Sequence, residues 1–358
     1  MKKVIAFVVM IPLILSTFIS CNFFTPISIT AGNNFCNINL LYGACDDENY
    51  VYYIAKDKKV MRISKESGTV TGMGVSTDFG GTLSIADGYL YLNSADYGQG
   101  DCVEVEPCKI NLNDIKDITY FNYETTGVSS VGDPVIIINN TIYFNGGLQK
   151  INKDGTGGGV VDGNHYRVIG VENNAIYAYI IEDEDIILEN KLYKHMTWVY
   201  KLSPHWEIEQ KLFQFCFETQ YPIEGGAYSV LPLFTVVFGE YMYGIMPAGY
   251  DPNYFGFCDY QLYRTQLSKN GEKEILFEFE NDYARILAVT EDGVYFYIEE
   301  AKTHYSSNIY RVNLDGTDIK ELPYKYDVYN FDTNGYYFVS NIDGKLYGIT
   351  DNKIFLIQ

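Results

Sequence analysis

A strand pattern repeated along nearly the whole chain constrains the fold more than any other feature. A turn signal followed by a short β-branched or aromatic triplet occurs seven times, with an average spacing of about 47 residues. The triplets are Val51-Tyr52-Tyr53, Tyr89-Leu90-Tyr91, Ile142-Tyr143-Phe144, Ile176-Tyr177-Ala178, Tyr241-Met242-Tyr243, Val294-Tyr295-Phe296 and Tyr336-Tyr337-Phe338. Most follow residue pairs that accept a positive φ, such as Asp87-Gly88 and Asn139-Asn140, as tight hairpin turns require. Each copy therefore predicts a β-hairpin.

A second strand follows each triplet, and six of the seven copies carry a basic residue at one position. These residues are Arg62, Lys109, Lys150, Lys201, Arg264 and Arg311, whereas Gly348 takes the place in the seventh copy. The two-residue period of a strand directs them to one face of the sheet. We interpret them as structural residues that pair with acidic neighbours on adjacent strands.

A turn and a short outer strand complete each copy, so the repeating unit is four antiparallel strands. Units of this kind are typical of a β-propeller, in which radial repetition leaves only short, protected edges. A solenoid has a shorter repeat and polar caps, and a sandwich would not show seven copies of one pattern. Residues 35–358 are therefore predicted to form a single all-β propeller domain, with seven blades or, alternatively, six.

One copy of the repeat resembles a known kind of blade. The stretch Asn308 to Leu322 is similar to one blade of low-density-lipoprotein-receptor-type, TolB-like and bacterial DUF5050 propellers, and Leu148 to Thr156 is a weaker copy. The Tyr-Trp-Thr-Asp signature of the receptor type is absent, so the chain resembles the DUF5050-like group more closely. This resemblance implies an exported propeller that acts as a binding platform, although fold likeness alone is weak evidence for an activity.

The N-terminus predicts export. Residues 1–20 have the layout of a signal peptide, with basic Met1-Lys2-Lys3 before the apolar run from Val4 to Leu15. Ile19-Ser20-Cys21 resembles the end of a bacterial lipoprotein signal, which implies that Cys21 is acylated and anchors the chain in the cell envelope, facing the periplasm or the surface. Residues 21–34 are then a flexible tether. An ordinary cleaved signal, with Cys21 incidental, is the alternative.

Six further cysteines agree with an oxidising compartment. They favour disulfides in the pairs Cys36 with Cys45, Cys102 with Cys108 and Cys216 with Cys258. Six cysteines allow fifteen pairings, so these are chosen by proximity in the sequence. Their spacing does not fit a zinc site, and free structural thiols are the remaining alternative.

Charge and missing motifs exclude several functions. A net charge of −20 argues against nucleic acid and against docking of the folded surface on anionic lipids, so membrane contact is expected through the anchor only. The chain lacks metalloprotease, serine-hydrolase and phosphate-loop motifs. No catalytic residue, cofactor or metal ligand is predicted. The acidic runs Asp46-Asp47-Glu48 and Glu182 to Asp185 are interpreted as solvated loops, with calcium binding as the alternative.

Aromatic residues in an expected long loop are the candidate ligand contacts. They are Tyr250, Tyr254, Phe255, Phe257 and Tyr260. Loops on a rigid scaffold often carry binding residues, and tyrosine provides contact area at low entropic cost. The sequence therefore predicts a monomeric, non-catalytic platform for a protein, peptide or glycan. The alternative is a polysaccharide hydrolase or lyase with carboxylates at the propeller axis.

Overall fold

The structure is a computed structural model, and every element that it describes is a β-strand or a connection between strands. The described residues are 29–31, 44–55, 57, 59–76, 82–93, 108–121, 135–144, 149–160, 166–182, 186–188, 191–218, 233–251, 256–268, 272–279, 283–299, 307–326, 337–340, 346–350 and 353–357. Within these ranges no helix is long and apolar enough to cross a membrane.

The first three sheets are named blades 1 to 3 in chain order. Blade 1 contains β2 (Ala44–Asp46), β3 (Tyr50–Ile54), β4 (Lys59–Ser64) and β5 (Val70–Ser76). Blade 2 contains β6 (Thr82–Ala86), β7 (Tyr89–Asn93), β8 (Cys108–Asn111) and β9 (Ile118–Tyr120). Blade 3 contains β1 (Ile29–Ala31), β10 (Ile136–Ile138), β11 (Thr141–Phe144), β12 (Gln149–Asn152) and β13 (Gly159–Val160).

Blades 4 to 6 and a final smaller sheet complete the fold. Blade 4 contains β14 (Arg167–Glu172), β15 (Ala175–Glu182), β16 (Ile186–Leu188), β17 (Lys191–Leu202) and β18 (Ile208–Glu218). Blade 5 contains β19 (Leu233–Phe238), β20 (Tyr241–Asp251), β21 (Gly256–Gln266) and β22 (Lys273–Phe279). Blade 6 contains β23 (Tyr283–Thr290), β24 (Gly293–Glu299), β25 (Ser307–Val312) and β26 (Lys320–Tyr326). The last, called the closing sheet, contains β27 (Tyr337–Ser340), β28 (Leu346–Thr350) and β29 (Lys353–Ile357).

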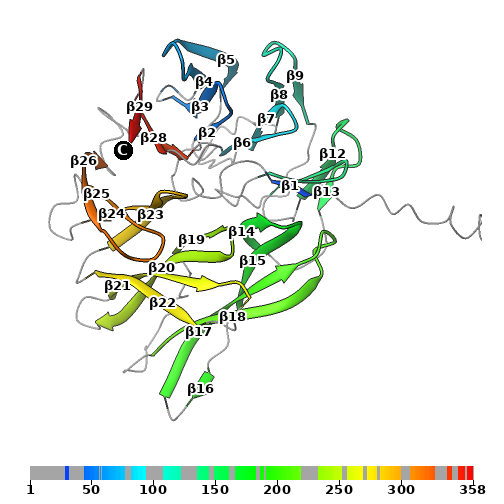
Figure 1. Ribbon diagram of the computed structural model, residues 1–358. Helices are drawn as coiled ribbons and strands as arrows, with labels where there is room; N and C mark the ends of the chain where they lie inside the picture. The colour runs from blue at the N-terminus through cyan, green and yellow to red at the C-terminus, as the bar shows by residue number, and fades with distance from the viewer. Residues whose placement is uncertain are drawn as a thin grey trace, which may run out of the picture.

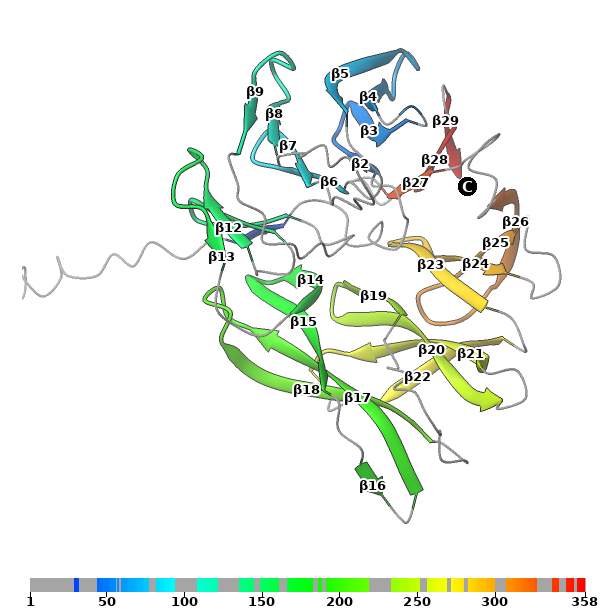
Figure 2. The same ribbon diagram turned by 180° about the vertical axis from the view of Figure 1, so that it is seen from behind.

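The sheets are arranged around a common centre, as both ribbon views show (Figures 1 and 2). Inner strands of neighbouring sheets contact one another, as β2 does β6, β14 does β19 and β19 does β23, and β27 contacts both β23 and β2. The closing sheet therefore lies beside blade 1, and we call their junction the seam. The predicted β-propeller of four-stranded antiparallel blades is confirmed. Six sheets have four or five strands, which agrees with the six-blade alternative; seven complete blades are not supported, because the closing sheet has three described strands.

The predicted tight turns occur where the sequence places them. Asp87-Gly88 joins Ala86 to its cross-strand partner Tyr89, and Asn173-Asn174 joins Glu172 to Ala175. Asp87 has φ of 54°, Gly88 of 76°, Asn173 of 49° and Asn174 of 60°. Positive φ at both central residues matches the right-handed twist of the flanking strands, which is why Asn, Asp and Gly are favoured there.

The hydrophobic core lies between the faces of neighbouring sheets. Between blades 1 and 2, Cys45 and Tyr52 pack in one buried cluster with Leu90 and Cys108. At the seam, Val51 and Tyr53 of blade 1 are fully buried, and Tyr347 of the closing sheet packs against the same cluster. Alternate residues of β3 therefore pack into two different junctions, because successive side chains of a strand point to opposite faces of the sheet.

Part of the predicted tether is a strand. Ile29 pairs with Ile138 and Ala31 with Ile136, so β1 takes the innermost place in blade 3. Residues 1–28, with the predicted signal peptide and Cys21, lie outside the described residues, and both remain predictions.

Two of the predicted disulfides need correction. Cys45 and Cys108 are free, buried thiols in the core between blades 1 and 2. A buried cysteine behaves there as a small apolar side chain. Their expected partners, Cys36 and Cys102, lie outside the described residues. Cys216 lies in β18 and Cys258 in β21, and a bond between them remains a prediction.

Candidate functional site

A tyrosine lies directly across the sheet from a basic residue in each of the six blades. The pairs are Tyr52 with Arg62, Tyr91 with Lys109, Tyr143 with Lys150, Tyr177 with Lys201, Tyr243 with Arg264 and Tyr295 with Arg311. In the closing sheet, by contrast, Phe338 lies opposite Gly348 and Val339 opposite Tyr347. The repeat found in the sequence is thus a repeated cross-strand pair.

At two junctions the basic side chain binds a turn of the next blade. Lys109 Nζ donates to the Lys153 carbonyl at 2.6 Å, and an Arg264 guanidinium N–H donates to the Leu314 carbonyl at 2.7 Å. The same groups lie over tyrosine rings of their own blade, 4.9 Å from the centre of Tyr89 and 4.8 Å from that of Tyr241. We call this combination of ring, cation and turn carbonyl the inter-blade clamp.

The predicted acidic partners of the basic residues are confirmed in two blades. Arg264 Nε donates to Glu274 at 2.7 Å, and Lys201 Nζ lies 3.0 Å from Glu209. This hydrogen bond to the Glu274 carboxylate raises the pKa of Arg264 above its usual value. Arg311 instead donates to the Asp292 carbonyl at 2.8 Å. The clamp to the next blade was not predicted, because it joins segments far apart in the sequence.

At the seam, the position that corresponds to the inter-blade clamp holds a different pair of side chains. Lys65 stands in the turn after β4, as Lys153 does after β12, three residues beyond the basic residue of the strand. Both donate their backbone N–H at 2.9 Å to an asparagine carbonyl in the preceding hairpin turn. The side chain of the closing sheet that faces Lys65 is Tyr347, whose ring centre lies 5.2 Å from Lys65 Nζ. The cation therefore comes from the turn of blade 1, and the ring comes from β28 of the closing sheet.

Buried acceptors fix Lys65 in place. Its Nζ donates to Asp46 Oδ2 at 2.7 Å and to the Asp47 carbonyl at 2.6 Å. Asp47 in turn accepts from the Tyr50 N–H and the Tyr52 hydroxyl, each at 2.7 Å. Burial, together with the hydrogen bond that the Tyr52 hydroxyl donates to Asp47, raises the pKa of Tyr52 well above its usual value. The ammonium group is thus held by a pre-organised hydrogen-bond network.

The acidic run before β3 is not the solvated loop that the sequence predicted. Asp46 is fully buried in β2 and paired with Lys65, and Asp47 stabilises the turn. Only Glu48 is exposed. No group of three or more His, Cys, Asp or Glu side chains that could hold a metal ion occurs in the described ranges. Parts of the second run, 183–185, lie outside them.

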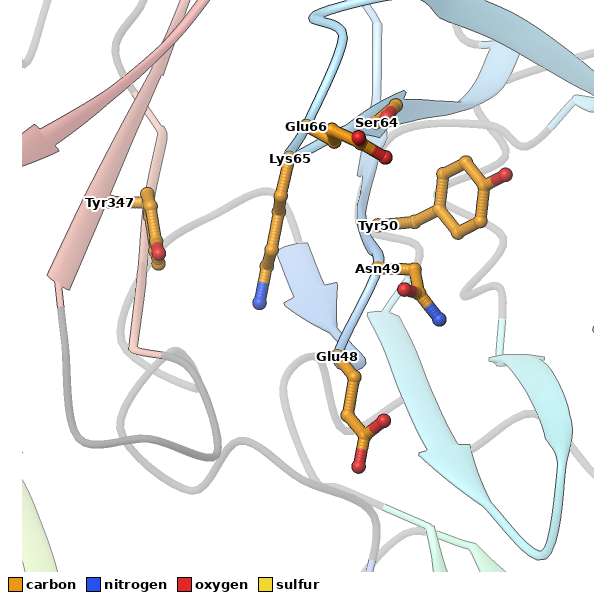
Figure 3. Close-up of a pocket in the computed structure, with 7 residues that line it drawn as sticks. All are labelled: Glu48, Asn49, Tyr50, Ser64, Lys65, Glu66 and Tyr347. Atoms are coloured by element: carbon orange, nitrogen blue, oxygen red, sulfur yellow. The ribbon is translucent and has the colours of Figure 1, made fainter.

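A pocket of about 420 Å³ opens at the seam (Figure 3). Its lining residues are Glu48, Asn49, Tyr50, Ser64, Lys65, Glu66 and Tyr347. Six come from two turns of blade 1 and the adjoining ends of β3 and β4, and Tyr347 comes from β28 on the opposite side. We call it the seam pocket. Its two aromatic rings, its fixed ammonium and its carboxylates suit binding of a polar ligand.

Three of the aromatic residues predicted to contact a ligand lie in described strands of blade 5. Tyr250 and Phe257 are cross-strand partners in the long β20–β21 hairpin of blade 5, where the sequence predicted a loop. Tyr260 is only 8% exposed and packs in the core. Tyr254 and Phe255 lie outside the described residues. Tyr260, the one of the five whose side chain the structure describes, is not among the lining residues of the seam pocket.

Comparisons with known proteins give no family. No protein-family profile matches the chain, and no curated protein matches it. The chain is similar in fold to PorZ, described as an essential bacterial surface component of the type-IX secretion system of Porphyromonas gingivalis, at a TM-score of 0.47 and 11% identity. The match covers 92% of this chain and 37% of PorZ.

Two other solved structures are similar to a comparable degree. YCF48 from Cyanidioschyzon merolae has a TM-score of 0.46 and 7% identity, with 92% of this chain and 98% of that chain covered. A structure from a study of two prolyl endopeptidases has a TM-score of 0.45 and 12% identity, with 90% and 46% covered. The chain thus spans less than half the length of PorZ and of that endopeptidase.

Proposed function

We propose that this protein is a non-catalytic binding platform that holds a protein, peptide or glycan ligand at the seam pocket. The observation that carries the proposal is the Lys65–Tyr347 pair with its pocket of about 420 Å³ between two sheets. Ligand sites are typically concave, largely pre-formed and of this size. Hydrogen bonds to Asp46 and Asp47 hold Lys65 in place, so its side chain would form a rigid part of the binding surface.

Export and lipid anchoring through Cys21 are a separate part of this proposal, supported by the sequence of residues 1–21. Two acyl chains give stable membrane attachment, whereas a single one is marginal. Replacing Cys21 by Ala should move the protein from the membrane fraction to the soluble fraction of expressing bacteria. Membrane attachment that persists in the Cys21→Ala variant would contradict the anchor.

No specific observation favours the polysaccharide-active alternative. A glycosidase acid needs a carboxyl group whose pKa is raised. The pKa values of the Asp57, Asp154 and Asp315 carboxyl groups are lowered, not raised, by hydrogen bonds from Lys59, Thr156 and Thr317 respectively.

The test is a thermal-shift screen of two matched variants. Glu66→Trp should fill the seam pocket, whereas Glu291→Trp places the same side chain on an exposed turn of blade 6. A ligand that binds only the folded state raises the thermal midpoint. Peptides, cell-wall glycans and polysaccharides are screened, and a ligand of the seam pocket should shift wild type and Glu291→Trp but not Glu66→Trp.

Two results would contradict the proposal. One is that every ligand shifts the midpoint of Glu66→Trp as much as that of wild type. The other is chemical turnover of a bound ligand, detected by mass spectrometry of the recovered ligand.

A further inference from the structure

We infer that the junction between blades 3 and 4 binds the carboxylate of an aspartate or glutamate side chain from a protein partner. The binding groups are the Lys150 ammonium and the Trp206 indole N–H, beside the rings of Tyr143 and Tyr166, and we call these four residues the junction site. None of them is among the lining residues of the seam pocket. The inference therefore stands apart from the function proposed for that pocket.

The first argument is that Lys150 lacks the partners that its counterparts have. Lys109 and Arg264 each lie over a tyrosine ring and donate to a turn carbonyl of the following blade. In blade 3, Thr141 stands at the cross-strand position that Tyr89 holds in blade 2, so the ring is missing. Among the described residues, the Lys150 side chain makes no hydrogen bond, ion pair or ring contact. Its ammonium is therefore available to a ligand.

The second argument is an indole N–H without an acceptor. Trp206 Nε1 is buried and has no hydrogen-bond partner in the part of the chain that the structure describes. A buried donor without a partner is costly, and a missing ion or ligand is one explanation for it. The Trp206 ring centre lies 5.5 Å from that of Tyr143, the cross-strand partner of Lys150. Because cross-strand partners share one face of the sheet, both donors lie where blade 3 packs against blade 4.

The third argument is the backbone of Trp206. It has φ of 63°, whereas the same position is Gly155, with φ of 83°, in blade 3 and Gly316, with φ of 85°, in blade 6. In all three turns this residue donates its N–H to the carbonyl three residues earlier. A Cβ at Gly155 would lie 3.9 Å from Phe121 of the preceding blade, so a side chain here reaches across the junction. Bulky residues rarely adopt positive φ, and such strain is concentrated at functional sites.

The donor set and the rings decide the class of ligand. One ammonium and one N–H match the two oxygens of a carboxylate. A phosphate dianion would meet a single positive charge, and the net charge of −20 opposes a dianion more than a monoanion. The Tyr166 ring is stacked on Trp206, with 6.2 Å between centres and 30° between planes, and covers an indole face that a sugar ring would need. A narrow aspartate or glutamate side chain needs no open ring face.

The experiment follows the indole N–H signals by nitrogen–proton correlation NMR. The chain contains two tryptophans, Trp198 and Trp206, and the Trp206→Phe variant identifies the Trp206 signal by its loss. The probes are the capped pentapeptide Ser-Gly-Glu-Gly-Ser, whose only carboxylate is the glutamate side chain, and its glutamine counterpart, at about 0.15 M salt. The glutamate peptide should move the Trp206 signal in a saturable way. The glutamine peptide, which lacks the charge, should bind more weakly.

Lys150→Met removes the ammonium and keeps the aliphatic chain. It should weaken binding of the glutamate peptide about fivefold or more, the loss expected for one charge-assisted hydrogen bond. The matched control is Lys116→Met, at an exposed turn residue of blade 2. It should change the affinity less than about twofold, because only a distant, screened charge is altered. Thermal midpoints of both variants verify that they are folded.

Three results would overturn the inference. The first is an equal affinity for the glutamate and glutamine peptides, and the second is an equal loss in Lys150→Met and Lys116→Met, since binding would then follow overall charge. Glucuronate and glucose are titrated in the same way. A shift of the Trp206 signal that depends on Lys150 and occurs with glucuronate, but not with the glutamate peptide, would assign the junction site to an acidic sugar instead.

Discussion

Lys65 donates a hydrogen bond of 2.7 Å to Asp46, a residue with no exposed surface. Replacing Lys65 by Met should therefore lower the free energy of unfolding by about 3–5 kcal/mol, because it leaves the Asp46 carboxylate buried without its cation. Urea unfolding measures the change. The double variant Asp46→Asn/Lys65→Met should lose less than the single variant, since it buries no unpaired charge.

The control for this ion pair is Lys59→Met. Lys59 pairs with Asp57, but both side chains are more than half exposed. Exposed pairs contribute at most about 1 kcal/mol. Similar losses in Lys65→Met and Lys59→Met would show that burial of Asp46 has no energetic consequence.

The inter-blade clamp predicts that Arg264→Met destabilises the ring. The variant loses the hydrogen bonds to Leu314 and Glu274 and the contact with the Tyr241 ring. A loss of about 1–3 kcal/mol in the free energy of unfolding is expected. Lys320→Met, at the exposed Lys320–Asp318 pair, should stay within about 1 kcal/mol of wild type. An unchanged urea midpoint for Arg264→Met would refute the clamp.

Close packing of the inner strands predicts that replacing Gly170 by any larger residue destabilises the fold. A Cβ atom at Gly170 in β14 would lie 2.5 Å from Cβ of Val237 in β19 of the next blade. Gly170→Ala should therefore cost about 1–3 kcal/mol through overpacking. Gly159→Ala, with no atom within 4 Å of the added Cβ, is the matched control and should stay within about 0.5 kcal/mol. Equal thermal midpoints would contradict this packing.

Stability should fall in alkaline solution because of the buried thiols. Burial raises the pKa of Cys108 from 9.0 to about 12. The unfolded thiol ionises above pH 9 while the folded thiol stays neutral, so stability is complete below pH 9 and declines as the pH rises toward 12. Between pH 8.5 and 10.5 this group should cost about 2 kcal/mol. Cys108→Ala should reduce the decline by that amount, measured by urea unfolding at both pH values.

The thiol state itself can be measured by alkylation. Iodoacetamide added to the protein in denaturant without reductant should modify Cys45 and Cys108, because both are free. Under native conditions the buried Cys45 thiol, whose pKa is raised by burial, should react slowly. Peptides linking Cys45 to Cys36, or Cys108 to Cys102, in mass spectra would restore the original disulfide prediction.

Local sequence patterns predicted the local structure well. The Asp-Gly and Asn-Asn turns and the basic residues of the third strands lie where the pattern placed them, because turn geometry and strand period depend on neighbouring residues. The burial of Asp46 could not be predicted from its neighbours in the sequence. An acidic run usually indicates a solvated loop, and its burial depends on Lys65, which the fold brings from a separate turn.

The seam pocket was not predictable for a related reason. Tyr347 and Lys65 belong to sheets at opposite ends of the described sequence, and only closure of the ring brings them together. The sequence also placed Gly348 at the position of the basic residue, whereas Tyr347 is the neighbour that faces Lys65. Of the predicted aromatic contacts, Tyr250 and Phe257 proved to be strand residues and Tyr260 part of the core, because strands β20 and β21 extend farther than their composition indicated.

Closure of the ring at the seam has a mechanical consequence. Among the described strands, none of blade 1 is hydrogen-bonded to a strand of the closing sheet, so side-chain packing such as that of Tyr347 against Val51 and Tyr53 joins them. Tension between these two sheets would load dispersion contacts and one cation–π pair, rather than a ladder of backbone hydrogen bonds in shear. A ligand bound between Tyr347 and the turns of blade 1 would contact both sheets and hold them together. The force needed to separate the closing sheet from blade 1 would then depend on whether the seam pocket is occupied.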